Sequence, residues 1–214
     1  MRYLILLFLI SSSSFCFSQT AEEFYKQGLE KLEEKEYKDA IESFSQAISN
    51  DKSNTTYLLK RGAENSQAYA LRSAIYINMK DYNGAIEDCK KALDIDPKNE
   101  LAYVRMGDAY FSQDPADYVE AMKAYNYAIN LNPKNKTALH NRGVAKKELK
   151  DYYGAIDDFN KAIILDAEYG SAYMNRGIAK SLLGDTPGAC IDWYLAGEMG
   201  QTEANEYIST RCNQ

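Results

Sequence analysis

The sequence predicts an all-α protein built from tandem helix pairs, and three observations support this fold class. Five similar segments begin at Glu36, Asp81, Asp117, Asp151 and Asp185. Each segment carries alanine at two fixed positions, and four of the five have a large side chain between the two alanines. The stretch upstream of each segment has Gly or Ser at one equivalent position. The segments start 34 to 45 residues apart. Repeats of this length indicate a solenoid, because one helix pair buries its apolar face only by stacking on its neighbours.

The first 18 residues predict a secretory signal peptide outside the fold. After a positively charged start, residues 3–10 form an unbroken apolar run, and Cys16 and Ser18 place small side chains before a cleavage site at Gln19. A membrane anchor needs about 20 apolar residues, and serines follow this run. Lipidation at Cys16 is an alternative, although Phe15 stands where that motif has a small residue. We therefore expect an exported mature chain, 19–214, without a membrane span.

Composition and motifs exclude several function classes. The net charge is −6, with 31 acidic and 25 basic residues, whereas a general nucleic-acid binder has a basic surface. The 18 tyrosines recur at repeat positions, so we interpret them as core residues. Phosphate-loop, serine-hydrolase and zinc-protease motifs do not occur. A single histidine, His140, does not make a zinc site. We expect no catalytic residue, metal or cofactor; a weak enzyme built around His140 and Asp108 is an alternative.

The repeats resemble the tetratricopeptide repeat (TPR), a 34-residue helix–turn–helix unit with alanine at positions 20 and 27 and an aromatic residue at 24. Position 20 is Ala40, Ala85, Ala121, Ala155 and Ala189; position 27 is Ala47, Ala92, Ala128, Ala162 and Ala196; position 24 is Phe44, Cys89, Tyr125, Phe159 and Trp193. The repeats cover 21–54, 66–99, 100–135, 136–169 and 170–203. The resemblance implies a right-handed superhelical solenoid with a capping helix at 202–211.

An eleven-residue insert, 55–65, separates the first two repeats. Eleven residues make close to three helical turns, and Arg61-Gly62-Ala63 echoes Arg72-Ser73-Ala74 at that spacing. The insert therefore predicts a longer first helix in repeat 2. A surface loop, in which Gly62 ends a short helix, is the alternative. The acidic pairs Glu87-Asp88 and Asp157-Asp158 of the second helices are expected on solvated faces.

Two cysteines near the C-terminus predict a disulfide. The turn at Gly200-Gln201 lies midway between Cys190 and Cys212, so an antiparallel fold about this turn brings them level. Export places them in a disulfide-permissive compartment, and exported bacterial TPR proteins often end in a similar cysteine pair. Closing a loop of about 23 residues stabilises by on the order of 3 kcal/mol. Thr202 is the expected N-cap of the capping helix. Cys89 is expected to be a buried free thiol.

The resemblance also implies a binding surface, because first helices line a concave groove that holds a partner's extended peptide or helix. By position, the groove residues are Tyr25, Leu29, Ala70, Leu71, Ala74, Val104, Arg105, Asp108, His140, Asn141, Val144, Met174, Asn175 and Ile178. One TPR subclass binds a C-terminal carboxylate through two Lys, two Asn and an Arg or Lys. In repeats 3 to 5 only Asn141 matches that set, so carboxylate binding is not expected.

These features together predict a non-catalytic scaffold or adaptor with a protein partner, in an exported bacterial setting that is periplasmic or extracellular. The mixed apolar and amide character of the groove suits a partly hydrophobic peptide or helix. The alternative is a structural protein that self-associates through the ends of its repeat array.

Overall fold

The computed structural model describes residues 20–49 and 58–212. The predicted signal peptide, 1–18, lies outside the described residues. The described part consists of helices joined by short turns, without strands, which confirms the all-α solenoid. The first helices are α1 (Ala21–Glu33), α3 (Leu58–Asn78), α5 (Glu100–Ser112), α7 (Lys136–Glu148) and α9 (Gly170–Leu182). The second helices are α2 (Tyr37–Ser49), α4 (Tyr82–Ile95), α6 (Tyr118–Leu131), α8 (Tyr152–Leu165) and α10 (Thr186–Glu198). The chain ends in α11 (Ala204–Tyr207) and a π-helical turn, η1 (Ile208–Cys212).

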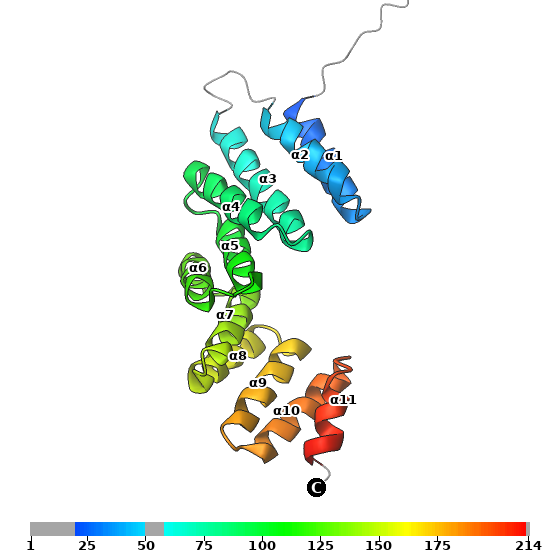
Figure 1. The fold of residues 1–214 in the computed structure, drawn as a ribbon, viewed down its shortest axis with the longest axis vertical. Coiled ribbons are helices and arrows are strands. Elements are labelled where there is room, and N and C mark those ends of the chain that lie inside the picture. Colours follow the sequence, from blue (N-terminus) through cyan, green and yellow to red (C-terminus); the bar gives the residue numbers. More distant parts are fainter. Residues whose placement is uncertain (1–19, 50–57, 213–214) are drawn as a thin grey trace, which may run out of the picture.

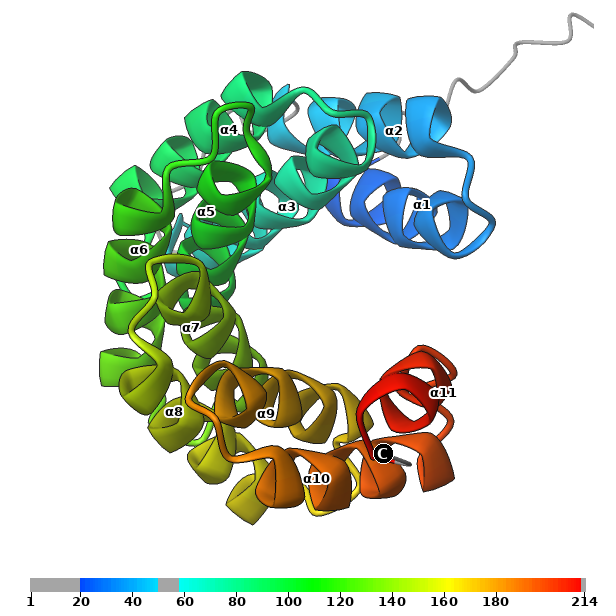
Figure 2. The same cartoon turned by 60° about the horizontal axis from the view of Figure 1, so that its bottom comes forward.

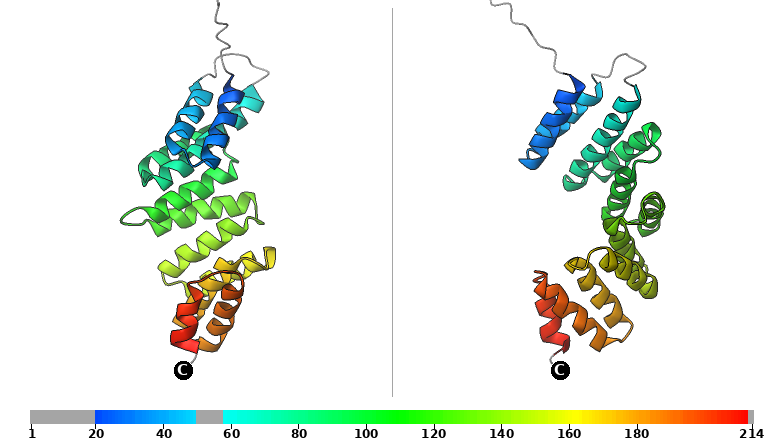
Figure 3. Two further views of the ribbon diagram at one scale, coloured as in Figure 1. Left: turned by 90° about the vertical axis from the view of Figure 1, so that its right-hand side faces the viewer. Right: turned by 180° about the vertical axis from the view of Figure 1, so that it is seen from behind.

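The helix pairs stack in chain order along the long axis of the molecule (Figure 1). Each second helix packs on its own partner and on the first helix of the next pair. Figure 2 shows that the stack curves into an open arc, with α1, α3, α5, α7 and α9 on the inner side. Views from the side and from behind show the same order of pairs (Figure 3). Among the described helices, none combines the length and apolar composition needed to cross a membrane.

The insert before repeat 2 is helical over the part that the structure describes. α3 begins at Leu58 and continues to Asn78 without a break, so residues 58–65 lengthen this helix to 21 residues. The other first helices have 13 residues. Residues 55–57 of the insert lie outside the described part. Over 58–65, the helix rather than the loop is the form that the chain adopts.

The two helices of a repeat cross where a glycine faces an aromatic ring. A Cβ atom added to Gly143 would lie 2.8 Å from Cε1 of Phe159, a ring that is fully buried. Gly28, Gly107 and Gly177 meet Phe44, Tyr125 and Trp193 in the same way. Repeat 2 has the buried pair Ser73 and Cys89 instead, a larger first residue against a smaller second one. The crossing thus conserves volume between repeats. Burial raises the pKa of the Cys89 thiol to about 12, which keeps it protonated.

Replacing Gly143 with Ala is expected to lower the free energy of unfolding by up to about 2 kcal/mol. Overpacking costs about 1–3 kcal/mol, and the better helix propensity of Ala offsets about 1 kcal/mol of it. Urea denaturation followed by circular dichroism measures the change. The matched control is Gly197→Ala, where a Cβ would meet only the Cβ of Ala204 at 3.9 Å. Equal effects of the two substitutions would refute the crowded crossing.

Ion pairs to buried aspartates join the two helices of a repeat, and the same arginines also bond to the preceding repeat. The Arg142 guanidinium donates from Nε to Asp158 Oδ2 at 2.8 Å and from its NH1 group to Asn126 Oδ1 at 2.7 Å, and so links α7 to both α8 and α6. Lys146 Nζ lies 2.8 Å from the same carboxylate. Arg176 makes the equivalent links to Asp192 and Asn160, and Arg72 to Asp88 and Ser45. Each arginine therefore holds three helices together.

The expectation that both acidic pairs lie on solvated faces is wrong for one member of each pair. Asp88 is 2% exposed and Asp158 is fully buried, whereas Glu87 and Asp157 are exposed. Successive helical residues point about 100° apart, so only one of two neighbours can face the arginine of the adjacent first helix. Repeat 3 has Met106 at the arginine position, and there Asn99 Nδ2 donates to Ser66 Oγ at 2.7 Å across the junction.

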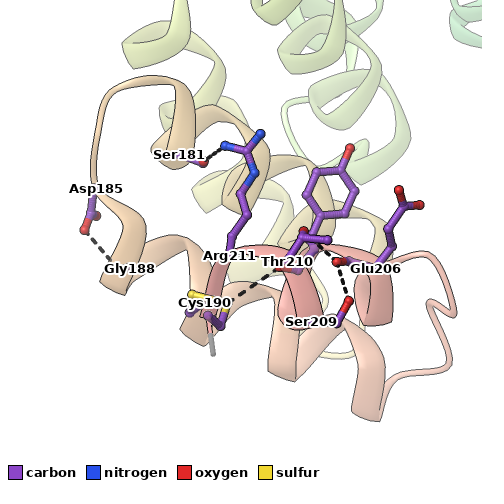
Figure 4. The surroundings of a disulfide bond; sticks show 10 residues. Ser181, Asp185, Gly188, Cys190, Glu206, Ser209, Thr210 and Arg211 are labelled. Carbon is purple, nitrogen blue, oxygen red and sulfur yellow. Dashed lines mark hydrogen bonds between the residues drawn. A yellow bond between two sulfur atoms is a disulfide. The ribbon is translucent and has the colours of Figure 1, made fainter. Parts of the chain in front are cut away.

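The C-terminal end of the array is covered by α11 and η1. Ala204 is fully buried, and the Tyr207 ring centroid lies 4.9 Å from that of Trp193 on α10. Cys190 of α10 and Cys212 are joined by a disulfide, with 5.7 Å between their Cα atoms (Figure 4). The N-cap of α11 is Glu203, without a side-chain cap, so the expectation of Thr202 was wrong by one residue. The terminal segment thus occupies the face that a further repeat would cover.

The N-terminal end of the array is polar. Thr20 and Glu23 form a reciprocal capping box at the start of α1. Glu23 stands where the later first helices have a fully or almost fully buried alanine: Ala68, Ala102, Ala138 and Ala172. Among the described residues, Glu23 is exposed at this position, whereas the alanines of the later helices are covered by the preceding repeat.

Candidate functional site

The inner face of the arc contains a cavity of about 480 Å³, here called the central cavity. Four first helices and one second helix contribute its lining: Ile77, Asp108, Phe111, Ser112, Tyr125, His140, Asn141, Val144 and Asn175. A second cavity of about 560 Å³, the turn cavity, lies beside the α4–α5 turn and includes Leu101, Val104, Arg105 and Thr137. Arg105 lines the turn cavity and Asp108 lines the central cavity. These two residues lie three positions apart on α5, so the two cavities share one face of this helix.

A chain of hydrogen bonds crosses the central cavity from α6 to α9. Asp108 Oδ1 accepts from the Tyr125 hydroxyl and from Asn141 Nδ2, both at 2.9 Å. Because a carboxylate only accepts, the Asn141 amide nitrogen faces Asp108, and its oxygen accepts from His140 Nδ1 at 3.0 Å. Asn175 Nδ2 donates to Ser171 O at 3.0 Å and to His140 Nε2 at 3.2 Å. The bonding pattern therefore assigns a neutral His140 with its proton on Nδ1.

The surroundings of His140 favour this neutral form. Its ring lies between the rings of Tyr169 and Phe159, with centroid distances of 5.1 and 5.6 Å. Burial lowers the pKa of His140 below the usual 6.5, and the charge of Lys147 acts in the same direction. Both ring nitrogens are already bonded, so His140 joins repeats 4 and 5 structurally. In contrast, burial and the neighbouring Asp108 carboxylate raise the pKa of the Tyr125 hydroxyl. This hydroxyl stays protonated and donates a hydrogen bond to that carboxylate.

Stability is expected to fall as the pH drops below about 6.5, in part because of His140. The pKa is lower in the folded chain than in the unfolded chain, so protons bind first to the unfolded state, and the loss continues until the pH reaches the folded pKa. Thermal midpoints of the natural protein and of His140→Gln, measured between about pH 7.5 and 5.5, test this. Carboxylates titrate in both proteins, so a pH-dependent difference isolates His140. Parallel curves would contradict the assignment.

The structure brings six of the expected groove residues together. Asp108, His140, Asn141, Val144 and Asn175 line the central cavity, and Arg105 lies beside Asp108 with 3.1 Å between its NH1 nitrogen and Oδ2. The other expected residues lie elsewhere: Tyr25, Leu29 and Leu71 pack around Phe44, and Ile178 packs near Trp193. Val104, which is 4% exposed, lines the turn cavity, and Met174, which is 8% exposed, supports the inner face from beneath.

Four lining residues were not expected from the sequence: Ile77, Phe111, Ser112 and Tyr125. Phe111 follows Asp108 by three residues, and Ile77 follows the expected Ala74 by three, so each lies one helical turn further along the same face. Continuing the groove by one turn would have found both. Among the described side chains, no three His, Cys, Asp or Glu residues gather in a way that could hold a metal ion.

Comparison with known families matches two segments of the chain. Residues 74–114 match a family model described as TPR repeat, and residues 137–169 match one described as tetratricopeptide repeat. These segments contain seven of the nine residues that line the central cavity.

Curated relatives match the chain over part of their length. The chain is 34% identical over 131 residues to the Hsp70/Hsp90 co-chaperone CNS1 of Saccharomyces cerevisiae, which covers 61% of this chain and 32% of that protein. It is 36% identical over 117 residues to a small glutamine-rich tetratricopeptide repeat-containing protein of Dictyostelium discoideum, which covers 55% and 31%. The matched part is about a third of each relative.

Solved structures share the fold. Pseudomonas aeruginosa pilF superposes with a TM-score of 0.73 at 19% identity, over 88% of this chain and 80% of that one. MamA superposes with a TM-score of 0.65 at 23% identity, over 83% and 96%. The repeat matches, the relatives and the shared architecture agree that this chain contains tetratricopeptide repeats.

Proposed function

We propose that this protein is a non-catalytic adaptor that binds a peptide or helix of a protein partner on the inner face of its arc. The central cavity carries the proposal, because it places apolar and amide side chains from four first helices on one surface. Relatives that are named co-chaperones of Hsp70 and Hsp90 support a protein partner. His140 has both nitrogens engaged, which favours a binding role over acid–base catalysis.

The proposed setting is export from a bacterial cell, either to the periplasm or beyond it. The apolar run at residues 3–10 and the small residues before Gln19 support a signal peptide. A disulfide between Cys190 and Cys212 also suits an oxidising compartment. A partner there is expected to bind through an internal segment, because the positions for carboxylate binding hold Val104, Asp108, Ser171 and Asn175.

The test is affinity capture from an envelope extract of the source cells, with residues 19–214 as bait. The groove variant is Asn141→Ala with Asn175→Ala. The matched control is Asn83→Ala with Asn130→Ala, which removes two exposed amides from the second helices α4 and α6. A partner lost with the groove variant and kept with the control supports the adaptor. A partner kept by both moves binding away from the inner face, provided that helicity and thermal midpoint are unchanged.

We do not propose self-assembly through the array ends as the function. Glu23 gives the first end a charged surface, and α11 with η1 covers Trp193 at the other. Light scattering of the mature chain separates the two cases, because end-to-end stacking would give a mass that rises with protein concentration.

A further inference from the structure

The central cavity has an apolar wall from three successive first helices. Ile77 of α3, Phe111 of α5 and Val144 of α7 line it, and each is only partly buried. Its volume of about 480 Å³ lies within the range of about 300–1,000 Å³ that is common for ligand sites. An apolar side chain that displaces water from a partly exposed apolar wall stabilises the complex.

On the polar side of the cavity, one amide oxygen can still accept a hydrogen bond. Asn175 uses its amide nitrogen twice, toward Ser171 O and His140 Nε2. Its Oδ1 has no hydrogen-bond partner among the described residues and is not sealed from solvent. In contrast, the amide oxygen of Asn141 already accepts from His140. The cavity therefore offers an acceptor at Asn175, which suits a ligand that carries an N–H group.

The charge of the cavity disfavours an anionic ligand. Among the described side chains that line it, Asp108 is the only acid, and no lysine or arginine joins it. The nearest guanidinium, that of Arg105, already pairs with Asp108 Oδ2 at 3.1 Å. A carboxylate that entered would meet the charge of Asp108, and the lining of the cavity offers no lysine or arginine to bind it. A neutral ligand meets no such penalty.

We propose that the central cavity binds one bulky, uncharged aliphatic side chain, of the leucine, isoleucine or methionine class, from an internal segment of the partner. The side chain lies against Ile77, Phe111 and Val144. A backbone N–H beside it donates to Asn175 Oδ1. This inference rests on the proposed adaptor function and names the chemistry that its partner presents.

Methyl and amide NMR on the mature chain tests the proposal with small probes. The neutral probe is N-acetyl-L-leucine amide, and the charged probe is N-acetyl-L-leucine, which differs in carrying a carboxylate. The neutral probe is expected to shift the methyl signals of Ile77 and Val144 and the side-chain amide of Asn175. It is expected to bind at least about fivefold more tightly than the carboxylate. Equal or tighter binding of the carboxylate, or unmoved Ile77 and Val144 signals, would overturn the proposal.

A pair of valine substitutions locates the binding. Val144→Asp places a second carboxylate in the cavity wall and is expected to abolish the shifts. Val119→Asp changes a valine that is 51% exposed on α6, outside the cavity, and is expected to leave them intact. Shifts that survive Val144→Asp would overturn the site. If partner capture depends on Asn141 and Asn175 while neither probe binds, this inference fails and the adaptor function stands.

Discussion

Replacing Asp158 with Asn is expected to lower the free energy of unfolding by about 3 kcal/mol. Asp158 is fully buried and is bound by Arg142 and Lys146 together. Removing its charge leaves two partly buried cations without an anion, and breaking a fully buried pair costs about 3–5 kcal/mol. We place the effect at the lower end, because the amide oxygen of Asn still accepts one hydrogen bond.

The neighbouring residue supplies the control for this prediction. Asp157 is 58% exposed in its side chain and pairs with Lys161 one turn along the same helix, so Asp157→Asn is expected to cost at most about 0.5 kcal/mol. Urea denaturation followed at the helical circular dichroism band compares the two variants. Similar midpoints for both would mean that the Arg142 link contributes little to the packing of repeats 3 and 4.

Opening the Cys190–Cys212 disulfide is expected to release the terminal cap. The bond closes a loop with a sequence separation of 22 residues, and the loop-entropy model assigns it about 3 kcal/mol. α11 has four residues and η1 five, which is too short for a helix to persist on its own. Tyr207 and Ala204 then leave Trp193 open to water. The earlier repeats should keep their helicity, because the disulfide joins only α10 to the chain end.

Trp193 is the only tryptophan in the sequence, so its fluorescence reports on the cap directly. Cys190→Ser and Cys212→Ser should each shift its emission to longer wavelength, and the double variant should add nothing, since all three lack the same bond. A reductant should reproduce the shift in the natural protein. Cys89→Ser serves as control, because the disulfide stays closed. Unchanged emission in both single variants, in the double variant and in the reduced natural protein would show that packing alone holds the cap.

The sequence alone determined the repeat architecture, because the information for it is local. Small residues at the helix crossings recur in every repeat, and a large residue between them recurs in four of the five. Because the same pattern occurs in successive repeats, a chance match in one repeat does not change the prediction. The same spacing placed the two C-terminal cysteines on opposite sides of a turn. The length of the insert predicted a helix over residues 58–65, where α3 has one. Helix ends were less certain, as the N-cap at Glu203 in place of Thr202 shows.

Only the tertiary structure decided which of two adjacent acids is buried and which side chains line the inner face. Asp157 and Asp158 have the same chemistry and the same helical neighbours. Asp158 is buried because Arg142 of the packed helix α7 faces it. The central cavity likewise depends on the curvature of the array. That curvature brings Ile77 and Asn175, 98 positions apart in the chain, to one cavity and leaves Met174 beneath the surface. Such contacts between repeats depend on how each pair is inclined to the next, and no single repeat encodes that angle.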